Sequence, residues 1–276
     1  MADKNKNHSD LTPGTVVGSY KIVKILNSDK TGDTCLANDT QLDKSVVIKF
    51  ISQNNPLKQV QHSMRLSHPN IISVYETGEY KNQNYLVMEY VIGKPLSEFI
   101  EEGSVSTEFT IDVGLQISDA LAYAHSESVI HGNIASSNII IDIDGRPRLS
   151  DFGLYSDKKN NQDDLCSLGT LLYEMLTGKS HSDFYAPGNT YDETILKTDL
   201  AGHSEKLIGI IVKLVSNNKA ACYNTADELY NALVSLPQSK KLSSQKPVDW
   251  WNRIVVPIAF IILVIVAIYW LFYRNK

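Results

Sequence analysis

The sequence has few cysteines and no excess of positive charge. Its three cysteines, Cys35, Cys166 and Cys222, lie more than 50 residues apart, which excludes a disulfide framework and the paired spacing of a zinc site. The 26 basic and 31 acidic residues give a net charge of −5. Such a chain offers no basic surface to a phosphate backbone, so we expect no nucleic-acid partner. An internal repeat is also lacking.

One long hydrophobic run stands out near the end of the chain. Residues 254–273 carry no charge, and as a helix they extend about 30 Å, the thickness of the hydrocarbon core of a bilayer. Aromatic residues flank the run on both sides, as they do at membrane interfaces: Trp250, Trp251, Tyr269, Trp270 and Tyr273. A buried core helix is the alternative, but this run is apolar on every face. We therefore expect one transmembrane helix, followed by a short tail at 274–276.

The remaining termini and charges predict the orientation. Residues 1–18 are polar and lack the apolar core of a signal peptide, so we expect a flexible N-terminus that is not exported. Residues 237–253 are rich in Ser, Lys, Gln and Pro, which is typical of a juxtamembrane linker. Four basic residues precede the hydrophobic run within 20 positions and two follow it, an excess that favours a cytoplasmic N-terminal domain. The expected protein is a single-pass membrane protein that contacts the lipid bilayer through residues 254–273.

The apolar pattern divides residues 19–236 into two parts. In residues 19–93, β-branched and aromatic residues form short runs separated by Asn, Asp, Gly and Lys, which predicts strands at 20–25, 34–37, 45–51, 71–76 and 84–90. In residues 94–236, apolar residues recur every three or four positions, which predicts helices near 111–124 and 168–176. The pattern predicts an α+β fold with a β-rich N-terminal lobe and an α-helical C-terminal lobe.

Six short strings give the chain a family resemblance. They are Val-Val-Ile-Lys at 46–49, His-Pro-Asn-Ile at 68–71, Val-Met-Glu-Tyr at 87–90, His-Gly-Asn at 131–133 with Asn138, Asp-Phe-Gly at 151–153 and Asp-Leu-Cys-Ser-Leu-Gly at 164–169. In this order and spacing they resemble the eukaryotic-type Ser/Thr protein kinases, most closely the bacterial membrane-anchored members. The resemblance covers residues 19–236 and implies a two-lobed protein-kinase-like fold, a cytoplasmic domain at a bacterial inner or cell membrane, and ATP and Mg²⁺ as cofactors.

Part of the nucleotide machinery is retained. By resemblance, Lys49 corresponds to the phosphate-binding lysine, and Gly32 and Met88 lie at the nucleotide site. Asn138 and Asp151 correspond to the two side chains that hold magnesium. The alternative for this last pair is structural, because Asn and Asp at turns and loop starts also bond to local backbone.

Other parts of the machinery are replaced. In the glycine-rich phosphate loop, Asn27 and Asp29 occupy the first two glycine positions, and Asp29 brings negative charge toward phosphate. Gln59 occupies the position of the glutamate that pairs with the strand lysine. Asn133 occupies the position of the catalytic aspartate, and an amide has no useful basicity as a proton acceptor. Ala135 replaces a phosphate-binding lysine of the same loop.

The activation segment is missing. Asp151 and Asp164 are only 13 positions apart, too few to build the segment on which a kinase docks its peptide substrate. With no intact catalytic residue, the sequence predicts a membrane-tethered pseudokinase, a scaffolding or regulatory module that binds a protein partner at the membrane. Two alternatives stay open: a weakly active atypical Ser/Thr kinase that transfers the γ-phosphate of ATP to protein, and an ATP-binding sensor without phosphotransfer.

Overall fold

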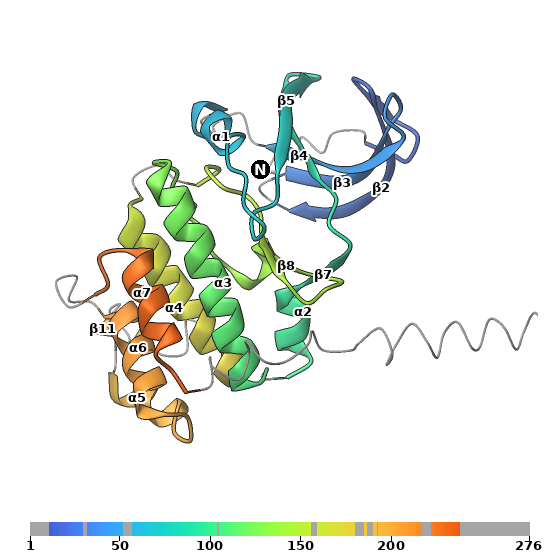
Figure 1. The fold of residues 1–276 in the computed structure, drawn as a ribbon. Helices are drawn as coiled ribbons and strands as arrows, with labels where there is room; N and C mark the ends of the chain where they lie inside the picture. The colour runs from blue at the N-terminus through green and yellow to red at the C-terminus, as the bar shows by residue number, and fades with distance from the viewer. Residues whose placement is uncertain are drawn as a thin grey trace, which may run out of the picture.

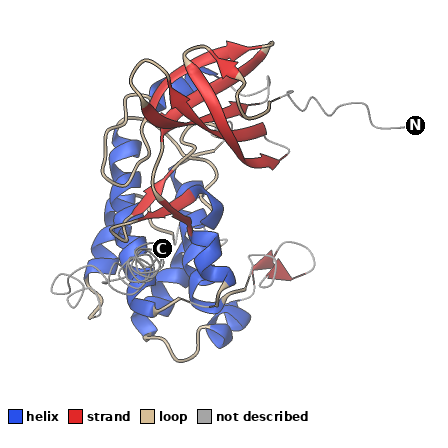
Figure 2. Ribbon diagram, turned by 90° about the vertical axis from the view of Figure 1, so that its right-hand side faces the viewer, coloured by secondary structure: helices blue, strands red, loops and turns tan. Residues whose placement is uncertain are grey.

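The chain folds into two lobes, seen in the computed structural model of Figure 1. The structure describes residues 11–29, 32–51, 57–103, 105–155, 159–179, 185–186, 190–191, 193–216 and 222–237. A twisted sheet forms the upper lobe and a group of helices the lower one (Figures 1 and 2). The expected protein-kinase-like arrangement of a β-rich N-lobe and a helical C-lobe is therefore confirmed.

The N-lobe is an antiparallel six-stranded sheet with strand order β1-β2-β3-β4-β6-β5. Its strands are β1 (Val16–Val17), β2 (Tyr20–Asp29), β3 (Gly32–Asp39), β4 (Lys44–Ile51), β5 (Val74–Tyr80) and β6 (Gln83–Glu89), and one helix, α1 (Leu57–Ser63), accompanies them. Along β3, buried and half-buried residues alternate, so Cys35 and Ala37 face the core of the lobe. This alternation is the physical basis of the predicted strand pattern.

The N-lobe begins earlier than residue 19. The side chains of Leu11 and Val17 are buried in the same cluster as Tyr20 and Ile22 of β2, and β1 pairs with the start of β2. Residues 11–18 therefore belong to the folded lobe, although the sequence predicts a flexible N-terminus over 1–18. Two buried apolar residues, together with backbone pairing at the edge of the sheet, are enough to fix this short polar segment.

The C-lobe is mainly helical. Its elements are β7 (Gly93–Pro95), α2 (Leu96–Glu101), α3 (Thr107–Ser126), η1 (Ser136–Asn138), β8 (Ile139–Asp142), β9 (Pro147–Leu149), α4 (Asn161–Thr177), β10 (Tyr185–Ala186), β11 (Thr190–Tyr191), α5 (Glu193–Asp199), α6 (Glu205–Val215) and α7 (Ala226–Val234). The buried faces of α3, α4, α6 and α7 form one continuous apolar core. The small sheet β7-β8-β9 lies on this core, on the side that faces the N-lobe (Figures 1 and 2).

The ends of α4 are set by local sequence. The Asn160 side chain accepts hydrogen bonds from the backbone N–H groups of Gln162 and Asp163, and the Asp163 carboxylate accepts one from the Asn160 N–H in return. At the other end, Gly178 takes a left-handed conformation with φ of 68°. Because the capping residue follows Asp151 by only nine positions, the short connection leads directly into this helix.

Among the described residues, no helix is both long and apolar enough to cross a membrane. The predicted transmembrane helix at 254–273 lies outside the described residues, as does the predicted linker beyond Pro237. Both stay predictions.

Candidate functional site

Lys49 and Asp151 meet at the junction of the two lobes. Lys49 lies on β4, and Asp151 lies in the loop after β9, with φ of 69°. The Lys49 Nζ atom is 2.5 Å from Asp151 Oδ2, and the two side chains are only 13% and 5% exposed. The resemblance assigns the Lys49 ammonium to phosphate and the Asp151 carboxylate to magnesium. In this structure the two groups form an ion pair with each other, at a site largely closed to water.

The helix that carries the position of the missing glutamate is short. Helix α1 spans seven residues and includes Gln59, whose side chain lies outside the described part of the structure. The Gln59 amide carries no charge and cannot form an ion pair with Lys49. The structure places the Asp151 carboxylate against Lys49 instead.

The phosphate loop is the tip of the β2–β3 hairpin. Asn27 is opposite Thr34 and Asp29 is opposite Gly32 in its register. Near the tip, Ser28 Oγ donates a hydrogen bond to Asp33 Oδ1 at 2.5 Å across the hairpin. Asp33 is buried, so this bond holds the two strands together on the inner side of the sheet.

Gly32 has a packing role in this hairpin. Its φ is 139°, and a Cβ atom added there lies 1.9 Å from the carbonyl oxygen of Phe50 on β4. Only glycine allows the hairpin to approach β4 this closely next to Lys49. The retention of this glycine is therefore explained by packing, without reference to a phosphate.

Met88 lies on β6, next to Val47 of β4 in the sheet register. Both side chains are buried in one apolar cluster together with Leu86, Val60 of α1 and Leu154. Val47 contributes its bulk to a packed cluster between the lobes.

The catalytic loop keeps its architecture although its base is replaced. The Asn133 N–H donates to His131 Nδ1 at 3.1 Å, and the Asn138 side-chain amide donates to the Asn133 carbonyl oxygen at 2.8 Å. The residue Asn133 itself is exposed. The position that would carry a proton acceptor is thus presented to solvent by an ordered loop, but it carries an amide.

The side chain of Asp164, near the start of α4, bonds to the backbone of this loop. Its fully buried carboxylate accepts hydrogen bonds from the backbone N–H groups of His131 and Gly132, at 2.9 and 2.7 Å, and lies 2.8 Å from His125 Nε2. Three contacts to one carboxylate satisfy a charge that is otherwise costly to bury. The string Asp-Leu-Cys-Ser-Leu-Gly thus has a structural explanation.

The two residues assigned to magnesium are adjacent, and each bonds to a neighbouring protein group. Ser150 donates both its N–H and its hydroxyl to the Asn138 carbonyl oxygen, which brings Asn138 beside Asp151. The Asn138 amide is bonded to Asn133, and Asp151 is bonded to Lys49. No cluster of three or more His, Cys, Asp or Glu suited to a metal ion is found in the part of the chain that the structure describes. Lys49 bonds to Asp151 Oδ2 and the Asn138 amide bonds through its nitrogen, so a magnesium ion would be held by the amide oxygen and the second carboxylate oxygen.

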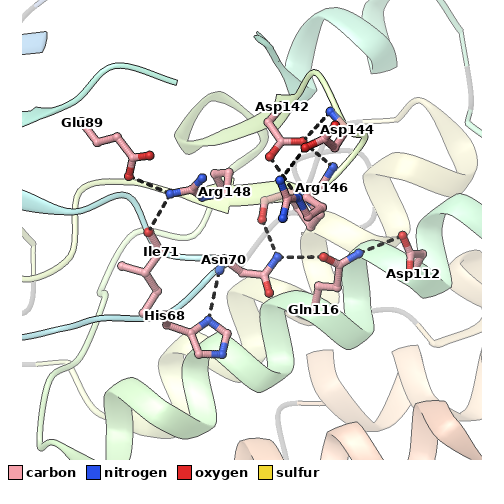
Figure 3. A network of polar contacts seen from close by, with 11 residues as sticks. His68, Asn70, Ile71, Glu89, Asp112, Gln116, Asp142, Asp144, Arg146 and Arg148 are labelled. Carbon is pink, nitrogen blue, oxygen red and sulfur yellow. Dashed lines mark hydrogen bonds and ion pairs between the residues drawn. The ribbon is translucent and has the colours of Figure 1, made fainter. Parts of the chain in front are cut away.

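A polar network that the sequence patterns did not indicate joins the two lobes (Figure 3). Arg148 Nη2 lies 2.7 Å from Glu89 Oε2 and 3.3 Å from the Ile71 carbonyl oxygen. Asn70 donates to the Pro147 carbonyl oxygen and to Gln116 Oε1 of α3. The one feature of the sequence that points to this network is that Arg148 lies three residues before Asp151. Its partners are distant in the sequence, so no local pattern links them to it.

Comparisons with known proteins agree with this geometry. The family model of the protein kinase domain matches residues 20–251. The serine/threonine-protein kinase PrkC of Bacillus subtilis is 28% identical over 201 residues, which cover 59% of this chain and 31% of PrkC. The serine/threonine-protein kinase PknB of Mycobacterium tuberculosis is 25% identical over 272 residues, which cover 81% of this chain and 44% of PknB. The chain thus spans less than half the length of these relatives.

A solved structure shows the same fold. The crystal structure of the Mycobacterium tuberculosis PknI kinase domain superimposes with a TM-score of 0.67 at 18% identity and covers 81% of this chain and 98% of that domain. At this identity the likeness shows the fold alone. Because the family model extends from β2 to beyond α7, over most of the sequence, this chain belongs to the protein kinase domain family.

Proposed function

We propose that this chain is a pseudokinase: a kinase-like domain that transfers no phosphate and acts by binding a protein partner at the membrane. The observation that carries the proposal is Asn133, an amide at the position of the catalytic base, in a loop that is otherwise fully ordered. Loss of a general base slows proton transfer by about 10²- to 10⁴-fold. The Lys49–Asp151 pair and the short connection to α4 support the same proposal.

Slow phosphotransfer is the first alternative. The names of PrkC and PknB describe serine/threonine-protein kinases, which favours this alternative. Lys49, Asn138 and Asp151 lie close enough to serve MgATP if the lysine releases its carboxylate partner. The alternative has to supply both a proton acceptor and a docking surface for the substrate, and neither is among the motifs of this sequence.

A radiolabel assay separates these functions. The full-length chain in detergent is incubated with labelled ATP, Mg²⁺ or Mn²⁺ and a generic protein substrate, beside an Asp151→Ala variant. We expect equal background incorporation in the two proteins. Incorporation by the natural chain that disappears in Asp151→Ala would contradict the proposal and establish the chain as a kinase.

ATP sensing without transfer is the second alternative, and thermal stability tests it. A ligand present at 100 times its dissociation constant adds about 2.7 kcal/mol to the free energy of unfolding. The melting temperature is measured with and without millimolar MgATP. An unchanged melting temperature excludes the sensor, whereas an increase without phosphate incorporation supports it. Partner binding is then sought by crosslinking in membranes, with a chain that lacks residues 254–276 as the control.

A further inference from the structure

The helices α2 and α3 carry an excess of negative charge. Residues 94–127, which include both helices, contain seven acidic residues and one basic residue, Lys94. The Lys94 Nζ atom lies 3.8 Å from Glu98 Oε2 and 3.9 Å from Glu102 Oε1, and all three side chains are exposed, so these ion pairs are weak. The other five carboxylates have no lysine or arginine partner among the described residues.

Two aromatic rings lie beside these carboxylates. Phe99 of α2 and Phe109 of α3 contact each other, with ring centroids 6.2 Å apart, and both are only partly buried against the C-lobe core. Residues three and four apart are neighbours on a helix, so Glu102 adjoins Phe99, and Asp112 adjoins both Glu108 and Phe109. These five residues are called the α2–α3 face. It combines an apolar surface with carboxylates and has no lysine or arginine of its own.

The carboxylate of Asp112 shows that this face lacks a cation. It accepts a hydrogen bond from Gln116 Nε2 at 2.9 Å (Figure 3). Burial raises the pKa of Asp112, and the bond from Gln116 opposes this shift only in part. A cation in contact would lower the same pKa. Within the described part of the chain, the charge of this carboxylate is therefore not matched.

The end of α7 brings the following part of the chain to the α2–α3 face. A Cβ atom added to Gly114 of α3 lies 3.2 Å from Leu233 Cδ1 of α7, so the two helices are in contact. The end of α7 and the start of α3 both lie at the bottom of the C-lobe in Figure 1. Leu236 is 0% exposed and fixes the last turn in the C-lobe core. Phe109 is five residues from Gly114, about 7.5 Å along the helix, so the chain leaves the core at Pro237 close to this face.

The segment that leaves the core has the complementary charge. In residues 237–253, basic residues outnumber acidic residues by four to one. The first two are Lys240 and Lys241, and Leu242 follows them directly. The four steps from Pro237 to Lys241 span at most about 14 Å, which is enough to reach the first turns of α3. Lysine side chains suit such a face, because their apolar stems pack on rings while their ammonium groups meet carboxylates.

From this complementarity we propose that residues 240–242 bind the α2–α3 face, with the two lysines against its carboxylates and Leu242 against its two rings. The contact leaves residues 243–253, at most about 40 Å of chain, between the domain and the expected membrane helix. It therefore turns the start of α3 toward the bilayer and determines which surface of the domain a membrane partner meets. The contact is independent of the proposed lack of phosphotransfer.

Tryptic cleavage after Lys240 and Lys241 tests this contact. The full-length chain in micelles of a neutral detergent is digested briefly, and mass spectrometry measures the rate at which these two bonds are cut. We expect Glu102→Gln combined with Glu108→Gln to raise the rate at least about threefold, because the lysines lose two of their partners. In the natural chain, about 0.5 M NaCl is expected to raise the rate as well, because salt screens exposed charges.

The matched control is Glu79→Gln combined with Glu127→Gln, which makes the same change of charge at exposed positions of β5 and of the far end of α3. We expect this variant to be cut at the rate of the natural chain. A second digestion with phosphatidylglycerol in the micelles separates binding to this face from binding to anionic lipid headgroups. Equal cleavage rates in the two double variants, or protection of the lysines only when the anionic lipid is present, would overturn the proposal.

Discussion

Lys49 and Asp151 are a positive and a negative charge that lie out of water and in contact. In the family to which this chain belongs, the corresponding residues serve the phosphates and the metal. Here each is the other's partner, and Gln59 offers Lys49 no competing charge. The chemistry of both residues is therefore tied to the stability of the junction between the lobes.

Lys49→Met is expected to destabilise the protein. The change leaves the buried Asp151 carboxylate without its cation, and a broken buried pair costs about 3–5 kcal/mol of the free energy of unfolding. Urea denaturation measures the loss. Lys44→Met, on the same strand but exposed against the Tyr75 ring, is the control and should cost less than about 1 kcal/mol. Equal stability of Lys49→Met and the natural chain would show that the ion pair is not structural.

His131 gives stability a dependence on pH. Burial lowers the pKa of its imidazole below the ordinary value of 6.5, although the neighbouring Asp164 opposes this shift. The neutral ring fits its partners, because Nε2–H donates to the Ser150 carbonyl oxygen and Nδ1 accepts from the Asn133 N–H. A lowered folded-state pKa means that the unfolded chain binds the proton more readily, so this stabilisation is present above about pH 6.5 and is lost as pH falls.

We therefore expect the free energy of unfolding to decrease between pH 7.5 and pH 5.5, with at most about 1.4 kcal/mol per pH unit from this residue. Denaturant titrations at both pH values measure the slope. In His131→Phe the contribution of residue 131 is absent, and the slope becomes shallower. His62→Phe, at an exposed position of α1, is the control. An unchanged slope in His131→Phe would argue against a neutral buried ring.

At the scale of elements, the β2–β3 hairpin contains a retained motif residue, Gly32, whose role is explained by packing. The sequence predicts strands at 20–25 and 34–37, and the structure extends both strands to the tip, at Asp29 and Gly32. The extension is stabilised by the Ser28–Asp33 bond and by the approach of Gly32 to Phe50. Neither contact adds a residue to the alternating apolar pattern. The strands predicted from that pattern therefore end before the tip of the hairpin.

Gly32→Ala is expected to destabilise the N-lobe by about 1–3 kcal/mol, because the added methyl group overlaps the Phe50 carbonyl oxygen. Gly103→Ala is a matched control: its φ of 132° is close to the 139° of Gly32, but a Cβ atom there meets no atom within 4 Å. The difference between their melting temperatures isolates the steric overlap from the backbone strain. Similar melting temperatures would contradict the packing role.

The segment at 71–76 shows a different limit. Its β-branched residues predict a strand, but β5 begins at Val74, and Ile71 instead forms a bridge to Leu149 and packs in the C-lobe core. Apolar side chains report that a residue is buried, but they do not report which lobe buries it. Helix α4, predicted near 168–176, is longer because its caps, Asn160 and Gly178, lie outside the apolar repeat.

At the scale of the whole molecule, the hydrophobic run at 254–273 predicts attachment to a membrane. We expect the full-length chain in the membrane fraction after an alkaline wash, and a chain without residues 254–276 in the supernatant, because the run supplies the only long uncharged stretch of the sequence. Immunoblotting of the fractions measures the distribution. Identical fractionation of the two chains would refute the anchor.

The sequence alone determined the two lobes and the family, and it predicts the lack of a base and of an activation segment, because these depend on residue types and on spacings counted along the chain. The tertiary structure decided the rest: Lys49 binds Asp151, 102 positions away, Gly32 serves packing, and Leu154 is buried in the apolar cluster between the lobes. Such contacts join distant segments, and each depends on where a backbone lies in space. A local pattern of charge or hydrophobicity does not specify where a distant backbone segment lies. Only the folded chain therefore shows that the motif residues Lys49 and Asp151 bind each other.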